Sequence, residues 1–452
     1  MHIHILGICG TFMGGLALIA KAAGHRVSGC DRNVYPPMST ELAAAGIEIM
    51  EGFDAAQLDL KPDLIVVGNV MKRGMPVIER MLNEKWPYTS GPQWLYEHYL
   101  KDKEVLAVAG THGKTTTTAM LTWILECAGK HPGFLIGGVP ENFQQGARAT
   151  DSPYFVIEAD EYDCAFFDKR SKFVHYHPSV AILNNLEYDH ADIFDDIEAI
   201  KKQFHHLVRT IPGRGSVVVP YDDANLADVL SRGLWSHKVV IGNAEGFDAQ
   251  DMAADGSSFT LCQHGSALGK VTLPCCGMHN VKNALAAIAA ASCIGIDPLQ
   301  AAQALATFKL PKRRLELVAA HADSAIYDDF AHHPTAIATT LQGLRAKVGP
   351  KAHIIAVFEP RSNSMKMGAN AQLLPKAFGA ADEVVVYQGP AVHFDVAAAL
   401  QGCPQPFQVF TDFDHMLQSL SAKLQPHTVI LCMSNGSFNG LPRKLAQMLP
   451  QA

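Results

Sequence analysis

Apolar positions at the start of the chain alternate between short strand-like runs and longer helix-like stretches. A strand is predicted at residues 2–6, followed by a glycine-rich turn at residues 7–15 and a helix at residues 16–23. Further apolar strands are predicted at residues 26–30 and 64–67. Strands that alternate with helices in this way form a mostly parallel sheet. The chain is therefore predicted to begin with an α/β domain.

The same alternation restarts after a polar stretch at residues 96–104. The first strand beyond it runs directly into a glycine-containing loop and an amphipathic helix, which indicates a second parallel α/β unit. Its predicted elements are strands at residues 105–109, 154–157 and 180–183, short strands and turns within 215–273, and an alanine-rich helix at 277–294.

A second boundary is predicted at residues 310–314, which read Leu-Pro-Lys-Arg-Arg. Beyond this hinge the strand and helix alternation resumes, with apolar strands predicted at residues 325–327, 354–358, 383–387 and 429–433. The pattern therefore predicts three α/β domains, which span residues 1–103, 104–311 and 312–452.

Length and composition are typical of a large globular protein. The 452 residues allow three domains, at roughly 150 residues each. Hydrophobic residues make up 48% of the chain and charged residues 18%, a balance that can bury several cores. The net charge of -7 argues against a nucleic-acid partner, because such proteins usually carry a basic surface.

The sequence also predicts a cytoplasmic chain with no membrane partner. The most apolar stretch, residues 284–296, is shorter than the roughly 20 residues that a membrane span needs. Residues 1–6 lack the basic segment and long apolar run of a signal peptide. The ten cysteines form no C-x-x-C pair, so we expect reduced thiols. A monomer is compatible with the sequence, which does not define the oligomeric state.

The clearest chemical signal is the loop after the strand at residues 105–109. It reads Gly110-Thr111-His112-Gly113-Lys114-Thr115-Thr116. Small residues let backbone N–H groups point at phosphate oxygens, a lysine meets the outer phosphates and a hydroxyl holds Mg²⁺. The match to the general phosphate-loop motif is partial, because Val108 stands where that motif has its first glycine. We interpret the loop as a nucleotide site centred on Lys114, with a plain turn as the alternative.

The N-terminal glycine-rich turn gives a weaker signal. It departs from the dinucleotide motif G-x-G-x-x-G, although Asp31 stands where a ribose-binding acid would stand. A nicotinamide or flavin site, a site for another nucleotide diphosphate and a purely structural turn all remain open from these residues alone.

Acidic residues follow two predicted strands of the central stretch. Residues 158–163 read Glu-Ala-Asp-Glu-Tyr-Asp, and residues 186–192 contain Asp189-His190 between further acids. The carboxyl ends of parallel strands face a ligand crevice, and Mg²⁺ needs only one or two carboxylates. A solvated acidic loop is the alternative, but the flanking acids favour a metal or phosphate role for His190.

Three further groups have residue types that suit a nucleotide. Asn280 and Asn283 open the alanine-rich helix, where their amides could bind adenine or Asn280 could simply cap the helix. Arg314 lies at the second hinge and could move onto a γ-phosphate. Asp329 and His332 follow the first strand of the third domain. The histidine pair there suggests zinc, but no third ligand is apparent, so zinc is not expected.

Taken in chain order, these motifs resemble those of the Mur ligase family. The resemblance covers essentially the whole chain, and that family has the same shortened phosphate loop. It implies three domains: a Rossmann-like N-terminal domain that binds a UDP sugar, a central P-loop domain with a mostly parallel sheet that binds ATP, and a Rossmann-like C-terminal domain that brings the amine substrate. The nicotinamide alternative is then disfavoured.

The resemblance also implies residue roles. Lys114, Glu158, His190, Arg314 and His332 would be catalytic, the last as a candidate general base. The implied Mg²⁺ ligands are Thr115, Glu158 and His190. The implied ATP-binding residues are Gly110, Thr111, His112, Gly113, Lys114, Thr115, Thr116, Asn280, Asn283, Arg314 and Asp329. The implied UDP-sugar site comprises Gly10, Thr11, Gly14, Gly15 and Asp31.

Within the family, residues 90–95, 162–170, 359–363 and 434–436 most resemble members that act in cell-wall recycling. Those members join UDP-N-acetylmuramate to L-alanyl-γ-D-glutamyl-meso-diaminopimelate through an acyl phosphate. The tripeptide carries three carboxylates, which the third domain would have to bind. The residues that we expect to do so are Arg361, Ser362, Asn363, Ser434 and Asn435.

One departure concerns a lysine that many members carry in carbamoylated form. Its position falls on Phe204, and the neighbouring Lys201 and Lys202 are out of register. In this respect the chain resembles members that add L-alanine to UDP-N-acetylmuramate. That activity and, more distantly, a P-loop NTPase that switches a partner are the alternatives.

Overall fold

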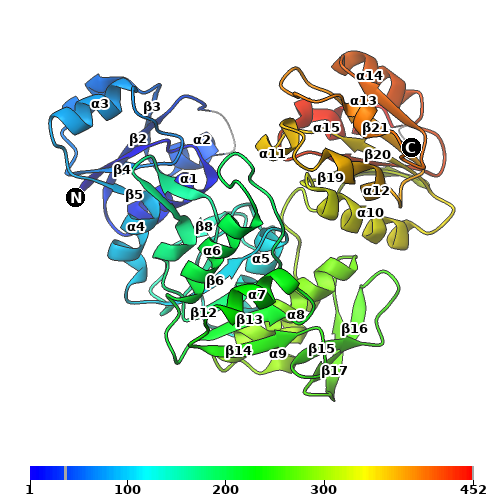
Figure 1. The fold of residues 1–452 in the computed structure, drawn as a ribbon, viewed down its shortest axis with the longest axis horizontal. Helices are drawn as coiled ribbons and strands as arrows, with labels where there is room; N and C mark the ends of the chain where they lie inside the picture. Colours follow the sequence, from blue (N-terminus) through cyan, green and yellow to red (C-terminus); the bar gives the residue numbers. More distant parts are fainter. Residues whose placement is uncertain (35–37, 450–452) are drawn as a thin grey trace.

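Each of the three predicted α/β stretches builds its own β-sheet in the computed structural model, which describes residues 1–34 and 38–449 (Figure 1). The predicted fold class, three α/β domains with mostly parallel sheets, is confirmed. Within the described residues no helix is long and apolar enough to cross a membrane. The exact domain limits stay predictions.

The N-terminal sheet is fully parallel, with the order β3-β2-β1-β4-β5. Alternate residues of its central strand face opposite sides: Ile3 and Ile5 pack into one cluster and Leu6 into another. The strands are β1 (His2–Leu6), β2 (Arg26–Asp31), β3 (Glu48–Glu51), β4 (Leu64–Val67) and β5 (Tyr88–Ser90). The helices are α1 (Thr11–Ala22), α2 (Met38–Ala44), α3 (Pro76–Asn83) and α4 (Gly91–Leu95), with short helices at Ala55–Leu60 and Tyr96–Leu100.

The central sheet has ten strands in the order β17-β16-β15-β14-β13-β12-β6-β9-β7-β8. Its middle is parallel, and the antiparallel pairs lie at the two edges. The strands are β6 (Glu104–Ala109), β7 (Gly133–Leu135), β8 (Ala147–Arg148), β9 (Tyr154–Glu158), β12 (Val180–Leu183), β13 (Ser216–Pro220), β14 (His237–Ile241), β15 (Phe247–Gln250), β16 (Ser258–Gln263) and β17 (Ser266–Thr272). A separate hairpin pairs β10 (Asp163–Ala165) with β11 (Asp168–Ser171).

The two faces of the central sheet are covered by different helices. Leu106 and Val108 face a cluster that contains α5 and α8, whereas Val105 and Ala107 face α6 and α7, as the two-residue period of a strand requires. The buried alanines of α8 let it approach α5 closely. The helices are α5 (Lys114–Cys127), α6 (Ile197–Val208), α7 (Ala224–Ser231), α8 (Met278–Cys293) and α9 (Pro298–Ala304), with short helices at Lys172–His175 and Leu305–Thr307.

The C-terminal sheet has the order β18-β19-β23-β20-β21-β22 and is parallel except for the edge strand β18. The sequence pattern missed β18 and β22, which are edge strands with little buried surface. The strands are β18 (Glu316–His321), β19 (Ser324–Asp329), β20 (His353–Phe358), β21 (Glu383–Tyr387), β22 (Phe407–Phe410) and β23 (Thr428–Met433). The helices are α10 (Pro334–Val348), α11 (Asn363–Lys366), α12 (Leu374–Ala377), α13 (Val396–Ala399), α14 (Phe413–Ser421) and α15 (Leu441–Ala446), with short helices at Ala371–Leu373 and Phe438–Gly440.

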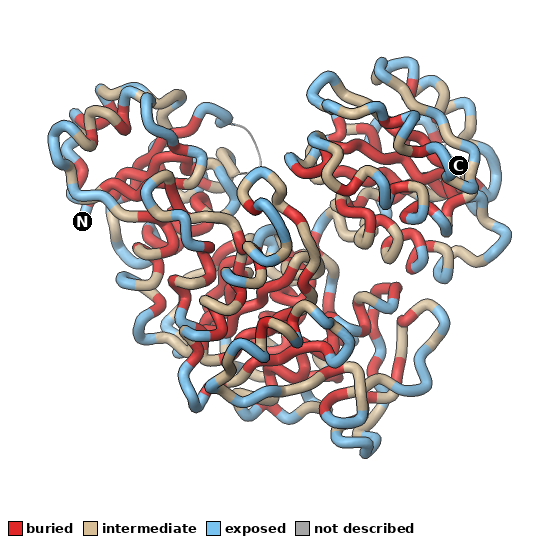
Figure 2. Tube along the Cα trace, viewed as in Figure 1, coloured by how far each residue is buried: buried red, intermediate tan, exposed pale blue. Residues whose placement is uncertain are grey.

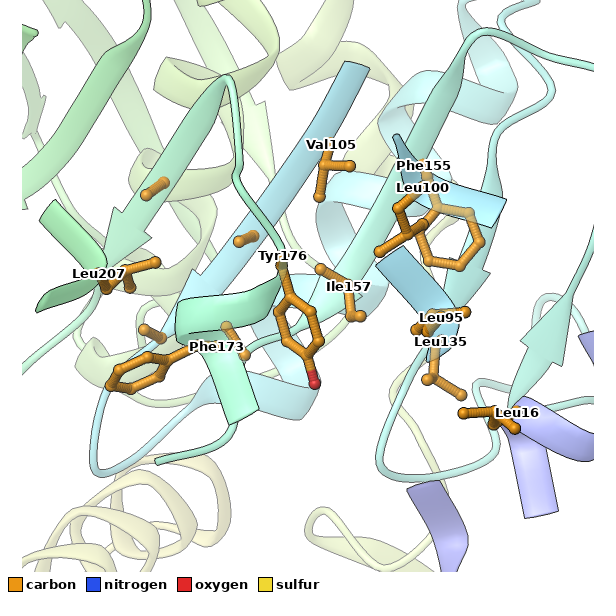
Figure 3. Packing of buried hydrophobic residues seen from close by; sticks show 14 of the residues in the cluster. Leu16, Leu95, Leu100, Val105, Leu135, Phe155, Ile157, Phe173, Tyr176 and Leu207 are labelled. Carbon is orange, nitrogen blue, oxygen red and sulfur yellow. The ribbon is translucent and has the colours of Figure 1, made fainter. Parts of the chain in front are cut away.

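Buried residues follow the three sheets (Figure 2), but the cores are not equally separate. One cluster runs from Leu16 of α1 through Leu135 of β7 to Phe155 and Ile157 of β9, so it joins the first and central domains (Figure 3). The two clusters of the third domain contain only residues of that domain. The first two domains therefore share a core, whereas the third has its own.

The described contacts between the third and central domains include several polar ones. Glu187 Oε2 accepts a hydrogen bond from Thr335 Oγ1 at 2.8 Å and lies 3.5 Å from His333 Nδ1. Asn363 Nδ2 donates to Asp192 Oδ2 at 2.8 Å. Polar contacts of this kind can be exchanged for water at low cost, so domain movement about the hinge is physically reasonable.

The contact at His333 predicts a pH dependence of stability. Burial lowers the pKa of His333 from 6.5 to about 4, so the unfolded chain binds more protons between these values. The free energy of unfolding should therefore fall as the pH drops from 6.5 toward 4, by at most about 1.4 kcal/mol per pH unit for this group.

Thermal melting of the wild type and of His333→Asn, at about pH 7 and about pH 5, checks this expectation. Asparagine keeps a helix-capping side chain before α10 but does not titrate. The variant should lose less stability on acidification than the wild type, and the same change at exposed His237 should not. An identical loss in His333→Asn and wild type would contradict the assignment.

Candidate active site

The phosphate-type loop lies between β6 and α5, where the sequence analysis placed it. Gly110 and Gly113 have φ values of +144° and +78°, which side chains with a Cβ rarely adopt. A Cβ on Gly113 would also lie 2.7 Å from Asn283 Oδ1. The two glycines therefore let the loop turn tightly at the N-terminus of α5, where free backbone N–H groups favour an anion.

Lys114 is held by a buried carboxylate that was given no role in the sequence analysis. Its Nζ donates to Glu161 Oε2 at 2.8 Å, to Glu161 Oε1 at 3.0 Å and to the Gly110 carbonyl at 2.6 Å. Burial alone would lower the pKa of Lys114, but the neighbouring carboxylates Glu161, Asp160 and Glu158 together outweigh it and raise that pKa. Lys114 is therefore a fixed cation at the end of the loop.

His190 binds the other side of the same carboxylate. Its Nε2 lies 2.9 Å from Glu161 Oε1, and this partner raises the pKa of His190 against the opposing effect of burial. The backbone at His190 has a φ of +56°, a strained conformation that surrounding contacts must maintain. His190 therefore contacts Glu161 in this structure, whereas the expected ligand set paired it with Thr115 and Glu158.

Thr115 and Glu158 do contact each other. Thr115 Oγ1 donates to Glu158 Oε1 at 3.0 Å, and Gly137 N donates to Glu158 Oε2 at 2.7 Å. Burial raises the pKa of Glu158, although the charge of Lys114 opposes this effect. A hydroxyl and a carboxylate oxygen at this distance, with His190 and Glu161 nearby, fit the oxygen-rich donor set that Mg²⁺ prefers.

A cavity of about 470 Å³ opens beside this loop, within the size range of small-molecule sites. It lies between α5, α8 and the start of α10, so the central and third domains both contribute. The predicted nucleotide residues that line it are His112, Gly113, Thr116, Asn280, Asn283, Arg314 and Asp329. The other predicted nucleotide residues, Gly110, Thr111, Lys114 and Thr115, are not among the lining residues. Thr111 instead bonds the backbone of Glu187.

The amides at the start of α8 are arranged in a chain. Asn280 Nδ2 donates to the Cys276 carbonyl at 2.7 Å, and Asn283 Nδ2 donates to Asn280 Oδ1 at 3.2 Å. Asn280 does not cap the helix, because Gly277 occupies the cap position, so that alternative is wrong. His279 Nδ1 is buried without a hydrogen-bond partner among the described residues, and burial lowers its pKa to about 4. A neutral imidazole beside two amides suits a flat aromatic base.

The hinge arginines point in different directions. Arg314 Nη2 donates to Thr115 Oγ1 at 3.2 Å, and burial lowers its pKa. Arg313 instead contacts Asp328 at 3.2 Å and the Ser434 carbonyl at 2.5 Å. Asp329 braces the turn after the hinge by accepting from Leu315 N at 2.6 Å. Arg314 is therefore the hinge arginine that reaches the phosphate loop.

A second cavity of about 390 Å³ lies between the first domain and the acidic segment that follows β9 in the central domain. Gly10, Thr11 and Asp31 line it, together with Glu158 and Asp160 of the central domain. Asp31 holds the glycine-rich turn, because its carboxylate accepts from Cys9 N at 2.9 Å and from Asn33 N at 3.2 Å. The described side-chain bonds of Asp31 thus support the loop, although it also faces the cavity.

The expectation for Gly14 and Gly15 is corrected. Neither lines the second cavity, and Gly14 N already donates within the helix to Gly10 O at 2.7 Å. A Cβ on Gly14 would overlap Met38, and one on Gly15 would overlap Leu135. These glycines serve close packing of α1, since the helix begins at Thr11, and the free N–H groups at its start belong to earlier residues.

The third-domain residues expected to bind the amine substrate lie outside both cavities. Ser434 Oγ donates to Glu359 Oε2 at 2.6 Å and is buried, whereas Arg361 has a 47% exposed side chain 3.5 Å from Glu359 Oε1. Asn363 is used in the contact with the central domain, and Ser362 caps α11. Asn435 Oδ1 is buried without a partner among the described residues.

The neighbouring histidines His332 and His333 of the third domain contact different groups. His332 Nδ1 donates to the Phe330 carbonyl at 3.1 Å, and burial lowers the pKa of His332 to about 4. It lines neither cavity, so a role as general base stays a prediction. His333 instead meets His112 and Glu187, whose ligand atoms all lie within 4.8 Å of one another. His332 is not part of this group, so the two neighbouring histidines do not form one metal site, and Glu187 already accepts from Thr335.

Two neighbouring asparagines were missed. Asn184 Nδ2 donates to Thr117 Oγ1 at 2.9 Å, and Asn185 Oδ1 accepts from His112 N at 2.8 Å. Both follow β12 directly, at the same kind of strand end as residues 158–163, and this position is the sequence signal that could have identified them. They link the phosphate loop to the next strand and help to fix its shape.

Comparison with known proteins agrees with this arrangement. Three family models match consecutive parts of the chain: the Mur ligase family catalytic domain at residues 2–102, the Mur ligase middle domain at residues 108–291, and the Mur ligase glutamate ligase domain at residues 313–436.

Relatives and a solved structure extend over the whole length. The Escherichia coli K12 UDP-N-acetylmuramate–L-alanyl-γ-D-glutamyl-meso-2,6-diaminoheptandioate ligase is 53% identical, over 98% of this chain and 97% of its own. The Rubrobacter xylanophilus UDP-N-acetylmuramate–L-alanine ligase is 32% identical, over 85% of this chain and 83% of its own. The crystal structure of a murein peptide ligase from Psychrobacter arcticus is 45% identical, with a TM-score of 0.76, over 100% of this chain and 99% of its own. Matches of this extent across all three domains establish that the chain belongs to the Mur ligase family.

Proposed function

We propose that this chain is an ATP- and Mg²⁺-dependent ligase that joins UDP-N-acetylmuramate to L-alanyl-γ-D-glutamyl-meso-diaminopimelate. The 53% identity to the Escherichia coli enzyme named for this reaction supports these substrates. The relative named for L-alanine addition is more distant, at 32%. The reaction would take place in the cytoplasm and return tripeptide to peptidoglycan synthesis.

The observation that carries the proposal is a path of two side-chain hydrogen bonds that links the two cavities. Arg314 lines the first cavity and donates to Thr115 at 3.2 Å. Thr115 in turn donates at 3.0 Å to Glu158, which lines the second cavity. A nucleotide in the first cavity and a carboxylate substrate in the second would therefore come together at the Thr115–Glu158 contact.

The surrounding residues suit phosphoryl transfer to a carboxylate. Bound ATP would supply the phosphoryl group that converts the carboxylate to an acyl phosphate, with Mg²⁺ shielding the charge. Lys114 would leave Glu161 or share it while neutralising the transferring phosphoryl oxygens. Asn280, Asn283 and His279 would hold the base. In the second step the amine of the tripeptide replaces phosphate on the carbonyl carbon.

The third domain has to supply the amine while closing over the nucleotide. It contributes Asp329 and the start of α10 to the first cavity, and its polar contacts with the central domain can break and re-form. Closure of this kind positions reactants, and positioning supplies a large part of catalysis in multi-substrate reactions.

L-Alanine addition is the competing activity. It would use the same phosphate loop and metal residues with a smaller amine. Phosphate release measured with UDP-N-acetylmuramate and either the tripeptide or L-alanine distinguishes the two. Efficient use of L-alanine with no use of the tripeptide would overturn the proposed substrate, and phosphate release that needs neither substrate would instead favour an NTPase switch.

Replacement of Lys114 by alanine should abolish most turnover. Removing one electrostatic contact to a transition state costs about 3 kcal/mol, or roughly 10²-fold or more in rate. Steady-state phosphate release is the measurement, with Lys101→Ala, an exposed lysine, as control. Near-normal turnover in folded Lys114→Ala protein would falsify the role of Lys114.

Activity should be independent of bicarbonate. Phe204 is fully buried and packs edge-on against Phe173, with ring centroids 5.3 Å apart, and Lys201 Nζ is already paired with Glu198 at 2.9 Å and Asp228 at 3.1 Å. No lysine is therefore in place to be carbamoylated at this position.

Bicarbonate-depleted enzyme should keep its rate, and Lys201→Ala should have a modest effect, as should the same change at exposed Lys202. Glu158→Ala and His190→Ala should instead raise the Mg²⁺ concentration needed for half-maximal rate. Recovery of a lost rate on adding bicarbonate would count against this interpretation.

Arg361 should matter for the tripeptide and not for ATP. Its guanidinium is half-exposed and only loosely paired with Glu359, at 3.5 Å, so it is available to a substrate carboxylate. Arg361→Ala should reduce kcat/KM for the tripeptide by about 2 kcal/mol or more, roughly 30-fold. The KM for ATP should stay close to the wild-type value. Arg443→Ala, an exposed arginine of the same domain, is the control, and equal effects of the two changes would contradict a specific role.

A further inference from the structure

The second cavity has an unusual charge balance for the ligand it is proposed to hold. UDP-N-acetylmuramate carries a diphosphate and a carboxylate, all anionic. The lining residues include three carboxylates, Asp31, Glu158 and Asp160. Among the described residues that line the cavity, Lys172 is the one lysine or arginine. An anionic ligand therefore meets a single cationic side chain there.

Lys172 is placed by the hairpin that follows the acidic segment. It begins the short helix Lys172–His175 directly after β11, and its backbone N donates to the Tyr162 carbonyl at 2.9 Å. The residue is 7% exposed. Its ammonium lies 5.5 Å from the ring centre of Phe12 and 5.6 Å from that of Tyr162. Two aromatic faces thus hold the side chain at the boundary between the first and central domains.

The ammonium has unused hydrogen-bonding capacity. A lysine offers three N–H donors, and the described side-chain bonds of Lys172 comprise one, to Asp160 Oδ2 at 2.6 Å. A buried ammonium with two donors free of protein acceptors is costly unless water or a ligand accepts them. Because Lys172 lines the cavity, a ligand in that cavity can reach these donors.

Asp160 orients the Lys172 ammonium and leaves its other N–H donors available to a ligand. The carboxylate of Asp160 accepts from Lys172 Nζ at 2.6 Å and so fixes the position of that ammonium. Asp160 lies two residues after Glu158. Its partner Lys172 is therefore near the proposed Mg²⁺ ligand Glu158 as well as near the glycine-rich turn.

We propose that Lys172 binds the carboxylate of the muramyl sugar and so selects the acidic sugar nucleotide. This inference rests on the proposed function. The start of α1 has no side-chain cap, and its free N–H groups suit the diphosphate. The carboxylate must reach the Thr115–Glu158 contact to be phosphorylated. Lys172 contacts a residue next to each of these points: Phe12 in the first turn of α1, and Asp160, two residues after Glu158.

Binding of two sugar nucleotides to the full-length protein tests the assignment. UDP-N-acetylmuramate and UDP-N-acetylglucosamine share the uridine, the diphosphate and the acetylated sugar, but only the first has the carboxylate. Titration calorimetry without ATP should show that Lys172→Met weakens UDP-N-acetylmuramate by about 10-fold or more, as expected for a hydrogen bond to a charged group. UDP-N-acetylglucosamine should bind Lys172→Met as it binds the wild type. Methionine keeps the length and apolar contacts of the stem.

The controls separate a direct contact from a structural one. Lys169→Met removes an exposed lysine of the same hairpin, 70% exposed and paired with Asp163, and should change neither affinity. Lys172→Arg keeps the charge and should retain part of the preference for the acidic sugar. If unpaired Asp160 unfolds Lys172→Met, the double variant Asp160→Asn/Lys172→Met removes that charge and should still bind the two nucleotides with similar affinity.

Each result decides the assignment. Equal weakening of both nucleotides would move Lys172 to the diphosphate and overturn the carboxylate contact. Unchanged binding of both would make Lys172 a structural ion pair and also overturn it. A wild-type protein that binds neither nucleotide would instead count against the proposed function, which keeps the two failures distinct.

Discussion

The buried ion pair of Lys114 with Glu161 organises the centre of this protein. Two ions removed from water are costly unless their geometry and hydrogen bonds compensate, and here the compensation is nearly complete. Lys114 Nζ reaches both Glu161 oxygens and the Gly110 carbonyl, and His190 binds the same carboxylate. The pair therefore fixes the ends of β6 and β9, the helix start of α5 and the segment after β12 relative to one another.

This arrangement keeps a strong cation beside the phosphate loop without leaving it free. When an anion enters the loop, Lys114 can exchange part of its contact with Glu161 for the anion, while His190 remains a partner for the carboxylate. The cost of separating the buried pair is thereby reduced. The same arrangement occurs at the preceding acidic residue, where Asp160 and Lys172 form a second cation–carboxylate pair at the edge of the other cavity.

The hydrophobic cores determine which domains can move relative to one another. The first and central domains share one hydrophobic cluster, so the cavity between them should keep its shape. The third domain has separate clusters and meets the central domain at polar groups such as Glu187 and Asn363. Exposing apolar surface to water costs free energy, whereas breaking polar contacts near the surface costs little. Movement is therefore expected at the hinge that carries Arg314, while the cavity between the first and central domains stays preformed.

The sequence predicted the features that depend on local order along the chain. Gly113, Lys114 and Thr115 follow one predicted strand, and Glu158 follows another. Residues in such positions lie at the carboxyl ends of the strands, whatever the rest of the fold. It could not predict features that depend on contacts between distant segments. Gly14 and Gly15 lie inside α1 and face Met38 and Leu135, whereas Gly10 precedes the helix. His190 meets Glu161 because the turn after β12 has a left-handed residue.

The same limit applies to the third domain and explains why its substrate residues are the least defined part of the site. Arg361 and Ser434 lie at the ends of β20 and β23, as the sequence pattern predicts, but Ser434 is bound to Glu359 and Asn363 to Asp192. Whether such side chains face a ligand depends on the position of the whole domain, which is set by the hinge and not by local pattern. A residue such as Lys172 differs, because its cavity lies within the body formed by the first two domains. Its surroundings should therefore change little on closure, and the charge it presents to a substrate is already determined by Asp160, Phe12 and Tyr162.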